Sequence, residues 1–221
     1  SVEVFVARAA ESSPGFELTD ATAGAVAELC IQLDGLPLAL ELAAARMASM
    51  TPRQLADRLT ERFALLGSGH GRAERHRTLL DVVQWSYGLL DATERTLFAR
   101  LAVFSGGFDL DAAERTCGGG DLSADGVAGV LGGLVDKSLV VASRTEEQFR
   151  YSQLETLRQF GAERLAEQPD GPLIHRAHMA TFVDRAVVGG AALDGPDEGT
   201  WSARLDGDMD NLRTALTTAI A

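Results

Sequence analysis

Residues 139–151, LVVASRTEEQFRY, have a different periodicity from the rest of this chain. Residues 139–141 form a short apolar run of the β type, and residues 144–147 have the polar composition of a turn. In residues 149–151 aromatic side chains then alternate with a polar one, as in a second strand. The pattern predicts a β-hairpin in a chain whose other segments have helical periodicity.

Helices are predicted on both sides of this hairpin. Asp91 opens a capping box at the start of one helix, Asp109 caps a second, and residues 125–136 form a third. A closing helix is predicted over 155–167, before the Pro-Asp-Gly-Pro boundary at 169–172. Three helices, a hairpin and a closing helix are the order of a winged helix, which we place at 77–168.

The N-terminal part, 1–66, is predicted to be a bundle of four or more short helices. Its clearest helix spans 20–34, after which Gly35 suits a left-handed C-terminal position and Pro37 suits the first turn of the next helix. Residues 67–76 have the composition of a polar, glycine-rich linker.

The C-terminal part, 173–221, is predicted to contain two helices, over 173–190 and 198–220. His175 and His178 lie in the first and have no zinc-ligand spacing with either cysteine, so we expect a solvated face there and no metal site. No nucleophile has an adjacent base, and we assign no catalytic residue. The predicted fold class is therefore mainly α, with one short β-hairpin.

Charge and composition exclude several functions. The net charge is −12, and the predicted third helix, 125–136, has no basic or amide side chain, so we expect no direct contact with nucleic acid. The only lysine, Lys137, follows Asp136, so the Gly-Lys pair of a phosphate-binding loop is absent and we expect no ATP hydrolysis. No apolar run is long enough to cross a membrane, and the two cysteines fit free thiols in the cytoplasm.

Five blocks of this sequence, in order, resemble the bacterial STAND ATPases, also called the NB-ARC or AP-ATPase group. The first is LDGLPLALELAAAR at 33–46, which resembles the group's LDGLPLAIELAAAR signature. The others are RHRTL at 75–79 with WSYGLL at 85–90, LAVFSGGF at 101–108, LETLRQF at 154–160, and the Trp201, Leu205, DNLR (210–213) and Ala215-Leu216 pattern near the end.

This resemblance implies a fold and a function. Residues 1–66 would be the helical lid, 77–168 the winged helix, and 173–221 the first helices of a TPR-like array. The ATPase core, absent from this chain, would hold ATP or ADP with magnesium, whereas the chain itself would need no cofactor. The parent protein would be a slow ATPase and a cytoplasmic regulator of the LuxR type, self-associating on activation. Its effector domain would be a DNA-binding domain or a nucleotide cyclase.

The resemblance also implies site residues. Gly35, Leu36 and Pro37 would face the adenine of a nucleotide bound by the missing core. Leu154 and Glu155 occupy the positions where eukaryotic relatives have a phosphate-contacting histidine and an aspartate; leucine cannot donate that hydrogen bond. From charge alone, Arg75, His76 and Arg77 are candidates to contact a phosphate or an acidic partner.

Two other functions remain open. A helical interaction scaffold with no nucleotide role would explain the many helices, and a winged-helix DNA-binding domain would explain the hairpin. The plain interpretations of the candidate residues are a helix–helix turn at Gly35-Leu36-Pro37, a solvated linker at 75–77 and a helix cap at Glu155.

Overall fold

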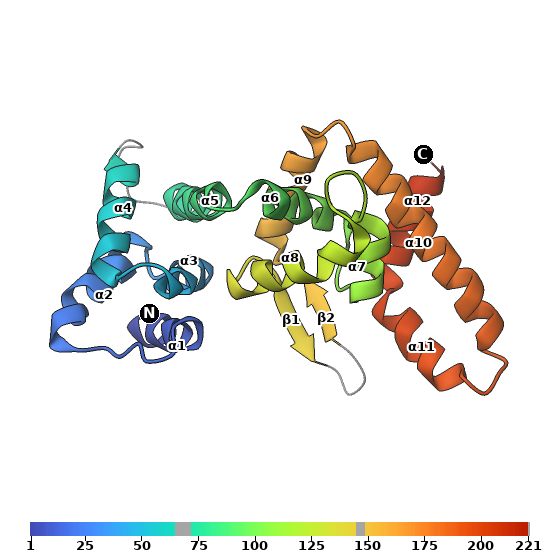
Figure 1. The fold of residues 1–221 in the computed structure, drawn as a ribbon, viewed down its shortest axis with the longest axis horizontal. Coiled ribbons are helices and arrows are strands. Elements are labelled where there is room, and N and C mark those ends of the chain that lie inside the picture. The colour runs from blue at the N-terminus through green and yellow to red at the C-terminus, as the bar shows by residue number, and fades with distance from the viewer. Residues whose placement is uncertain (65–71, 145–148, 221) are drawn as a thin grey trace. The chain divides into compact units, whose positions relative to one another are not determined.

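A computed structural model describes residues 1–64, 72–144 and 149–220, with the backbone alone described at 62–64 and 72–77. The chain divides into two compact units. Unit 1 comprises Ser1–Leu90 with Asp136–Ser138, and unit 2 comprises Asp91–Val135 with Leu139–Ala221. Figure 1 labels the helices and strands of both units.

Unit 1 is helical throughout its described residues. Its elements are α1 (Val2–Ser12), α2 (Asp20–Gln32), α3 (Pro37–Ala44), the 3-10 helix η1 (Ala45–Ala48), α4 (Pro52–Ala64) and α5 (Arg72–Gly88). Helix α1 packs on α3, α2 on α4, and α3 on α5. The core contains Phe5, Leu29, Leu40, Leu55 and Leu59, all at most 1% exposed.

Unit 2 begins with a winged helix. Its elements are α6 (Ala92–Arg100), the 3-10 helix η2 (Leu101–Val103), α7 (Leu110–Cys117), α8 (Ala124–Asp136), β1 (Val141–Arg144), β2 (Phe149–Ser152) and α9 (Glu155–Ala166). The two strands are antiparallel, with Val141 opposite Ser152 and Arg144 opposite Phe149. The predicted mainly α class with one short hairpin is confirmed.

Three helices complete unit 2: α10 (Gly171–Ala192), α11 (Glu198–Gly207) and α12 (Met209–Ile220). Helix α10 packs on α12 and also on α7, so the C-terminal helices share a core with the winged helix. That core includes Phe98, Phe104, Phe108 and Phe182, each at most 1% exposed.

The capping predictions are confirmed. The Asp91 carboxylate accepts the Glu94 amide N–H at 2.8 Å, and the Glu94 carboxylate accepts the Asp91 amide N–H at 3.1 Å. Asp109 caps α7 by accepting the Ala112 amide N–H at 2.8 Å. These short-range hydrogen bonds depend on residue type and spacing alone, and for that reason the sequence reveals them.

Several predicted boundaries are wrong. The predicted linker at 67–76 is helical from Arg72 onward, and its residues 67–71 lie outside the described residues. The first strand begins at Val141 rather than Leu139, because the amide N–H groups of Leu139 and Val140 donate to the Leu134 carbonyl oxygen of α8. The predicted single helix over 198–220 is interrupted at Asp208.

His178 also differs from the expectation of a solvated face. It is 2% exposed and packs against Phe104 and Phe182, because α10 is covered on this side by the winged helix and α12. Within the described ranges, no group of three or more His, Cys, Asp or Glu residues could hold a metal ion. Over those same ranges no helix is long and apolar enough to span a lipid bilayer.

Candidate functional site

Residues 104–109 connect η2 to α7 and contact both the hairpin and the C-terminal helices; we call them the junction loop. Phe108 and Tyr151 pair as an antiparallel β-bridge, each amide N–H donating to the other's carbonyl oxygen, at 2.9 and 2.7 Å. The junction loop therefore pairs with β2 at one residue, Phe108. Since β2 belongs to the wing, this bridge joins the wing to the junction loop.

Helix α12 binds the opposite end of the junction loop through Asn211, which is fully buried. The Asn211 side-chain amide donates to the Gly107 carbonyl oxygen at 2.9 Å, and its Oδ1 accepts the Ser105 amide N–H at 2.8 Å. The Thr214 hydroxyl donates to Ser105 Oγ at 2.9 Å. The Ser105 N–H and the Gly107 carbonyl oxygen lie in a loop and take part in no helix or strand, so the Asn211 side chain of α12 supplies a hydrogen-bond partner to each.

Aromatic rings fix the junction loop against α10. Phe104 stacks on Phe108 with ring centroids 4.3 Å apart, and it meets Phe182 edge-on at 6.1 Å. His178 lies beside both Phe104 and Phe182, with Nε2 3.2 Å from Asn211 Oδ1. Burial lowers the pKa of His178, and the hydrogen bond with Asn211 opposes this shift.

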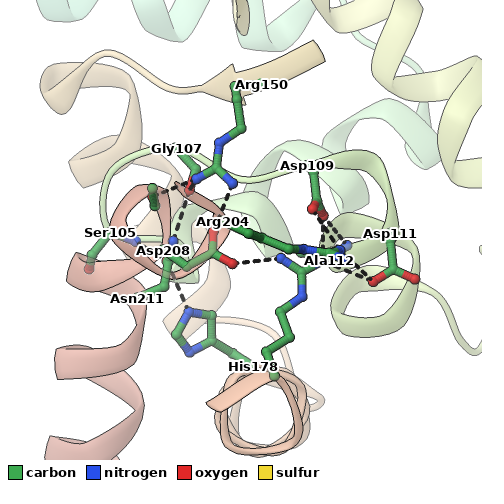
Figure 2. A network of polar contacts seen from close by, with 12 residues as sticks. Ser105, Gly107, Asp109, Asp111, Ala112, Arg150, His178, Arg204, Asp208 and Asn211 are labelled. Carbon is green, nitrogen blue, oxygen red and sulfur yellow. Dashed lines mark hydrogen bonds and ion pairs between the residues drawn. The ribbon is translucent and has the colours of Figure 1, made fainter. Parts of the chain in front are cut away.

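Arg185 of α10 is only 3% exposed and forms ion pairs with three aspartates. Figure 2 shows this ion-pair network, with Asp109, Asp111 and Asp208 labelled. Arg185 contacts Asp109 and also donates to Asp111 Oδ2 at 2.9 Å and to Asp208 Oδ2 at 2.8 Å. Burial opposes the charge, but the aspartates together raise the pKa of Arg185 above its ordinary value. Likewise, burial would raise the pKa of Asp109, but Arg185, the Ala112 amide and Arg204 together lower it.

Asp208 joins this network to the wing and is fully buried. Its second oxygen accepts a hydrogen bond from Arg150 of β2 at 2.8 Å. Arg150 also donates to the carbonyl oxygens of Gly107 and Gly207, at 2.8 and 2.6 Å. The break between α11 and α12 at Asp208 therefore places one carboxylate between an arginine of the wing and an arginine of α10.

The charges of this network are paired with one another. Every charged group named above faces an opposite charge, and none is a nucleophile beside a base. A buried ion pair contributes little net stability, but removal of one partner typically costs about 3–5 kcal/mol. Such a site holds its elements in one arrangement and resists small independent shifts.

Helix α8 occupies the position that a recognition helix takes in a DNA-binding winged helix. Its exposed side chains come from alanine, glycine and aspartate: Ala124, Asp125, Ala128, Gly129, Gly132 and Asp136. None of these can donate to a phosphate or to a base edge from its side chain. On the hairpin, Arg144 is exposed, whereas Arg150 is held by Asp208.

The predicted nucleotide-facing residues form a sharp turn in unit 1. Gly35 has a positive φ of 64°, and its N–H donates to the Cys30 carbonyl oxygen at 3.0 Å. Pro37 is the first residue of α3, and its ring is exposed, while Leu36 is half-buried. The geometry agrees with the local prediction, and the adenine role stays a prediction.

The C-terminal end of the 33–46 block contacts the 85–90 block. Arg46 is 5% exposed, lies 5.8 Å from the centre of the Trp85 ring, and donates to the Ser86 carbonyl oxygen at 3.3 Å. The Thr78 hydroxyl donates to Asp34 Oδ2 at 3.2 Å. Two of the sequence blocks, 33–46 and 85–90, therefore meet where α3 and η1 pack on α5.

The remaining predicted residues are separate from the junction loop. Leu154 is 40% exposed at the N-cap of α9, without a side-chain cap. The side chains of Arg158 and Gln159 donate hydrogen bonds to the Glu155 carboxylate. These bonds, that of Arg158 above all, lower the pKa of Glu155 to about 2, so the partners of Glu155 lie within its own helix. Residues 75–77 lie in α5, but the side chains of Arg75, His76 and Arg77 lie outside the described ones.

The sequence reasoning missed Arg185, Asp208, Arg150 and Arg204, which form most of the network. One signal was present: Arg185 follows Phe182 by three positions and His178 by seven, on the buried face of α10. A charged residue at a core position of a helix indicates a buried partner. The identity of that partner could not be inferred, because Asp208 and Asp109 are distant in the sequence.

Two comparisons with known proteins bear on the site. Residues 90–166 match the family model described as a winged helix-turn-helix domain. A protein of Mycobacterium tuberculosis, provisionally named an HTH-type transcriptional regulator, is 42% identical over 217 residues, which cover 98% of this chain. An uncharacterized protein of the same species is 40% identical over 198 residues, or 86% of this chain.

The chain spans only part of these relatives. The aligned region is 24% of the regulator and 50% of the uncharacterized protein. The match over residues 90–166 covers α6 to α9 and the junction loop. The predicted domain limits at 1–66, 77–168 and 173–221 stay predictions.

Proposed function

We propose that this chain is the switch segment of a longer bacterial transcriptional regulator of the STAND type. The provisional name of the 42%-identical relative supports a role in transcription, and the five sequence blocks support control by ATP or ADP. In this proposal the winged helix is a coupling module. It passes the state of a nucleotide-binding core, outside this chain, to an effector domain also outside it, in the cytoplasm.

The observation that carries the proposal is the junction loop. One loop of six residues bonds the wing through Phe108 and α12 through Ser105 and Gly107. Arg150 and Arg185 reach the same carboxylate, Asp208, from β2 and from α10. Packed polar networks of this kind transmit a displacement because they have few intermediate arrangements.

Hydrogen exchange can test this coupling. We expect Arg150→Gln to speed amide exchange in α12 and the junction loop by about tenfold or more, since a hydrogen bond between charged groups contributes about 1.5–3 kcal/mol. The matched control is Arg144→Gln, an exposed arginine on the same hairpin, which should leave α12 unchanged. Faster exchange confined to β1 and β2 in Arg150→Gln would contradict the coupling role.

The nucleotide role concerns the turn in unit 1. Pro37 exposes a flat apolar ring with a fixed backbone, and Gly35 permits close approach of a ligand. In the longer protein, Pro37→Ser should weaken ADP binding, whereas Pro14→Ser, at an exposed position between α1 and α2, should not. If ADP affinity is unchanged and partner binding is lost, the interaction-scaffold function is favoured instead.

A second candidate function is direct DNA binding by the winged helix. It is favoured by the family match over residues 90–166 and by the HTH-type name of the relative. We favour coupling because the exposed face of α8 has no basic or amide side chain. Since the aligned region is 24% of that relative, its name can refer to a part with no counterpart in this chain.

A further inference from the structure

A pocket of about 340 Å³ opens between α7, α10 and α11, next to the ion-pair network. Its apolar wall is formed by Val187 and Val188 of α10, which are 69% and 54% exposed, and by the half-buried Trp201 of α11. Trp201 packs on Gly189, where an added Cβ would lie 2.9 Å from the indole ring. The absence of a side chain at Gly189 therefore helps to seat the aromatic wall.

Charged side chains of both signs line the rest of the pocket. Arg115 pairs with Asp184 at 2.6 Å, and Asp111 accepts from the buried Arg185 at 2.9 Å. Arg204 lies 3.7 Å from Asp111 and 5.4 Å from the centre of the Trp201 ring. Asp111, Asp184 and Arg115 are 56%, 63% and 41% exposed, so both signs are accessible to a ligand.

These walls define the chemistry of a ligand. A simple anion would approach Asp111 and Asp184 as well as the arginines, and a simple cation would meet the arginines, so each would be partly repelled. A zwitterion can place its carboxylate on Arg115 and its ammonium on an aspartate. An apolar group on the same molecule would cover the two valines and the indole.

We propose that this pocket binds a small zwitterion with an apolar side group, the chemistry of a free apolar amino acid. The volume lies at the lower end of the range for ligand pockets, which favours a molecule of that size. Bound there, the ligand would bridge α7 and α10 beside Asp109. The binding itself does not depend on the proposed switch function.

Calorimetry on the 221-residue chain tests the proposal with three matched probes. L-leucine has both charges, isocaproate lacks the ammonium group, and isoamylamine lacks the carboxylate. We expect L-leucine to bind with a Kd of about 1 mM or tighter, and each of the other two at least about tenfold more weakly. No detectable heat from L-leucine, or equal affinity for isocaproate or isoamylamine, would overturn the proposal.

Two variants and a control locate the binding. Arg115→Gln should weaken L-leucine binding about tenfold through loss of a charge-assisted hydrogen bond, and Val187→Ser should weaken it through loss of apolar contact. Arg213→Gln is the control, because Arg213 forms a surface ion pair with Asp210 outside the pocket. Unchanged melting temperatures would show that all three variants fold. Wild-type affinity in Arg115→Gln would overturn the assignment to this pocket.

Discussion

Arg185 is the residue at which the separate elements of unit 2 meet. Its guanidinium group contacts carboxylates from the start of α7 and from the break between α11 and α12. Arginine suits this position because its planar, multidentate group remains charged when buried. Methionine has a similar apolar stem and no donor, so it removes the ion pairs with little change in volume.

We expect Arg185→Met to lower the free energy of unfolding by about 3–5 kcal/mol, because it leaves Asp109 and Asp208 buried without their shared partner. Urea denaturation measures this change. The control Arg213→Met removes an arginine that is 72% exposed, and it should stay within about 0.5 kcal/mol of the wild type. A loss below about 1 kcal/mol in Arg185→Met would show that the network does not hold the elements together.

His178 makes the stability of unit 2 depend on pH. Burial lowers its pKa, opposed by the hydrogen bond with Asn211 and assisted by His175. The unfolded chain therefore binds more protons than the folded chain below the ordinary histidine pKa of about 6.5. The contribution of His178 to the free energy of unfolding is fully present above that pH and is lost as the pH falls toward the folded-state pKa.

We expect His178→Gln to flatten the fall in unfolding free energy between pH 7 and pH 5, a slope of at most about 1.4 kcal/mol per pH unit from one proton. Denaturation at a series of pH values measures the slope. His175→Gln, at an exposed position of the same helix, should retain most of it. An unchanged slope in His178→Gln would assign the pH dependence to other groups.

At the scale of elements, α8 combines a helical backbone with exposed glycines. An added Cβ would meet no atom within 4 Å at Gly129 or at Gly132, and neither glycine has a positive φ. We expect Gly129→Ala and Gly132→Ala each to raise the free energy of unfolding by about 0.5–1 kcal/mol, by restricting the unfolded chain. Thermal unfolding measures the gain.

Gly189→Ala in α10 is the matched comparison, because its Cβ would lie 2.9 Å from the Trp201 ring and 3.0 Å from Leu205. It should lower stability through overpacking. Destabilisation by Gly129→Ala or Gly132→Ala would mean that α8 is packed closely on both faces, contrary to the description above.

The elements show how far sequence reasoning reaches. Caps at Asp91 and Asp109 and the turn at Gly35 were predicted, because each depends on interactions within a few residues. The break at Asp208 was not predicted, although the preceding pair Asp206-Gly207 favours a turn. At the break, Asp208 pairs with Arg150 and Arg185, and these partners could not be inferred because they lie far away in the chain.

The candidate site divides in the same way. The turn at Gly35-Leu36-Pro37 could be predicted from the residue types at these three positions, and Pro37 is exposed as a ligand contact would require. The LAVFSGGF block was recognised as a pattern, and its junction role emerges only from the contacts of Ser105 and Gly107 with Asn211. Contacts between residues that lie this far apart in the chain cannot be predicted from residue spacing or composition.

Across the whole chain, the sequence contains no Gly-Lys pair of the kind that a phosphate-binding loop requires. Its only lysine is Lys137, and no phosphate-binding loop is present in the sequence. We expect the 221-residue chain to show no ATP hydrolysis above background in a phosphate-release assay, with or without magnesium. Tight, magnesium-dependent ATP binding by this chain in calorimetry would contradict the proposal that a separate core holds the nucleotide.

We propose that the winged helix couples other parts of a regulator and does not itself read DNA. The most direct test is fluorescence anisotropy of this chain with a pool of duplex DNA at a series of salt concentrations. We expect no saturable binding tighter than a Kd of about 10⁻⁴ M, because the net charge is −12 and the exposed face of α8 has no side-chain donor. Micromolar binding that weakens steeply with salt and is lost in Arg144→Gln would contradict it.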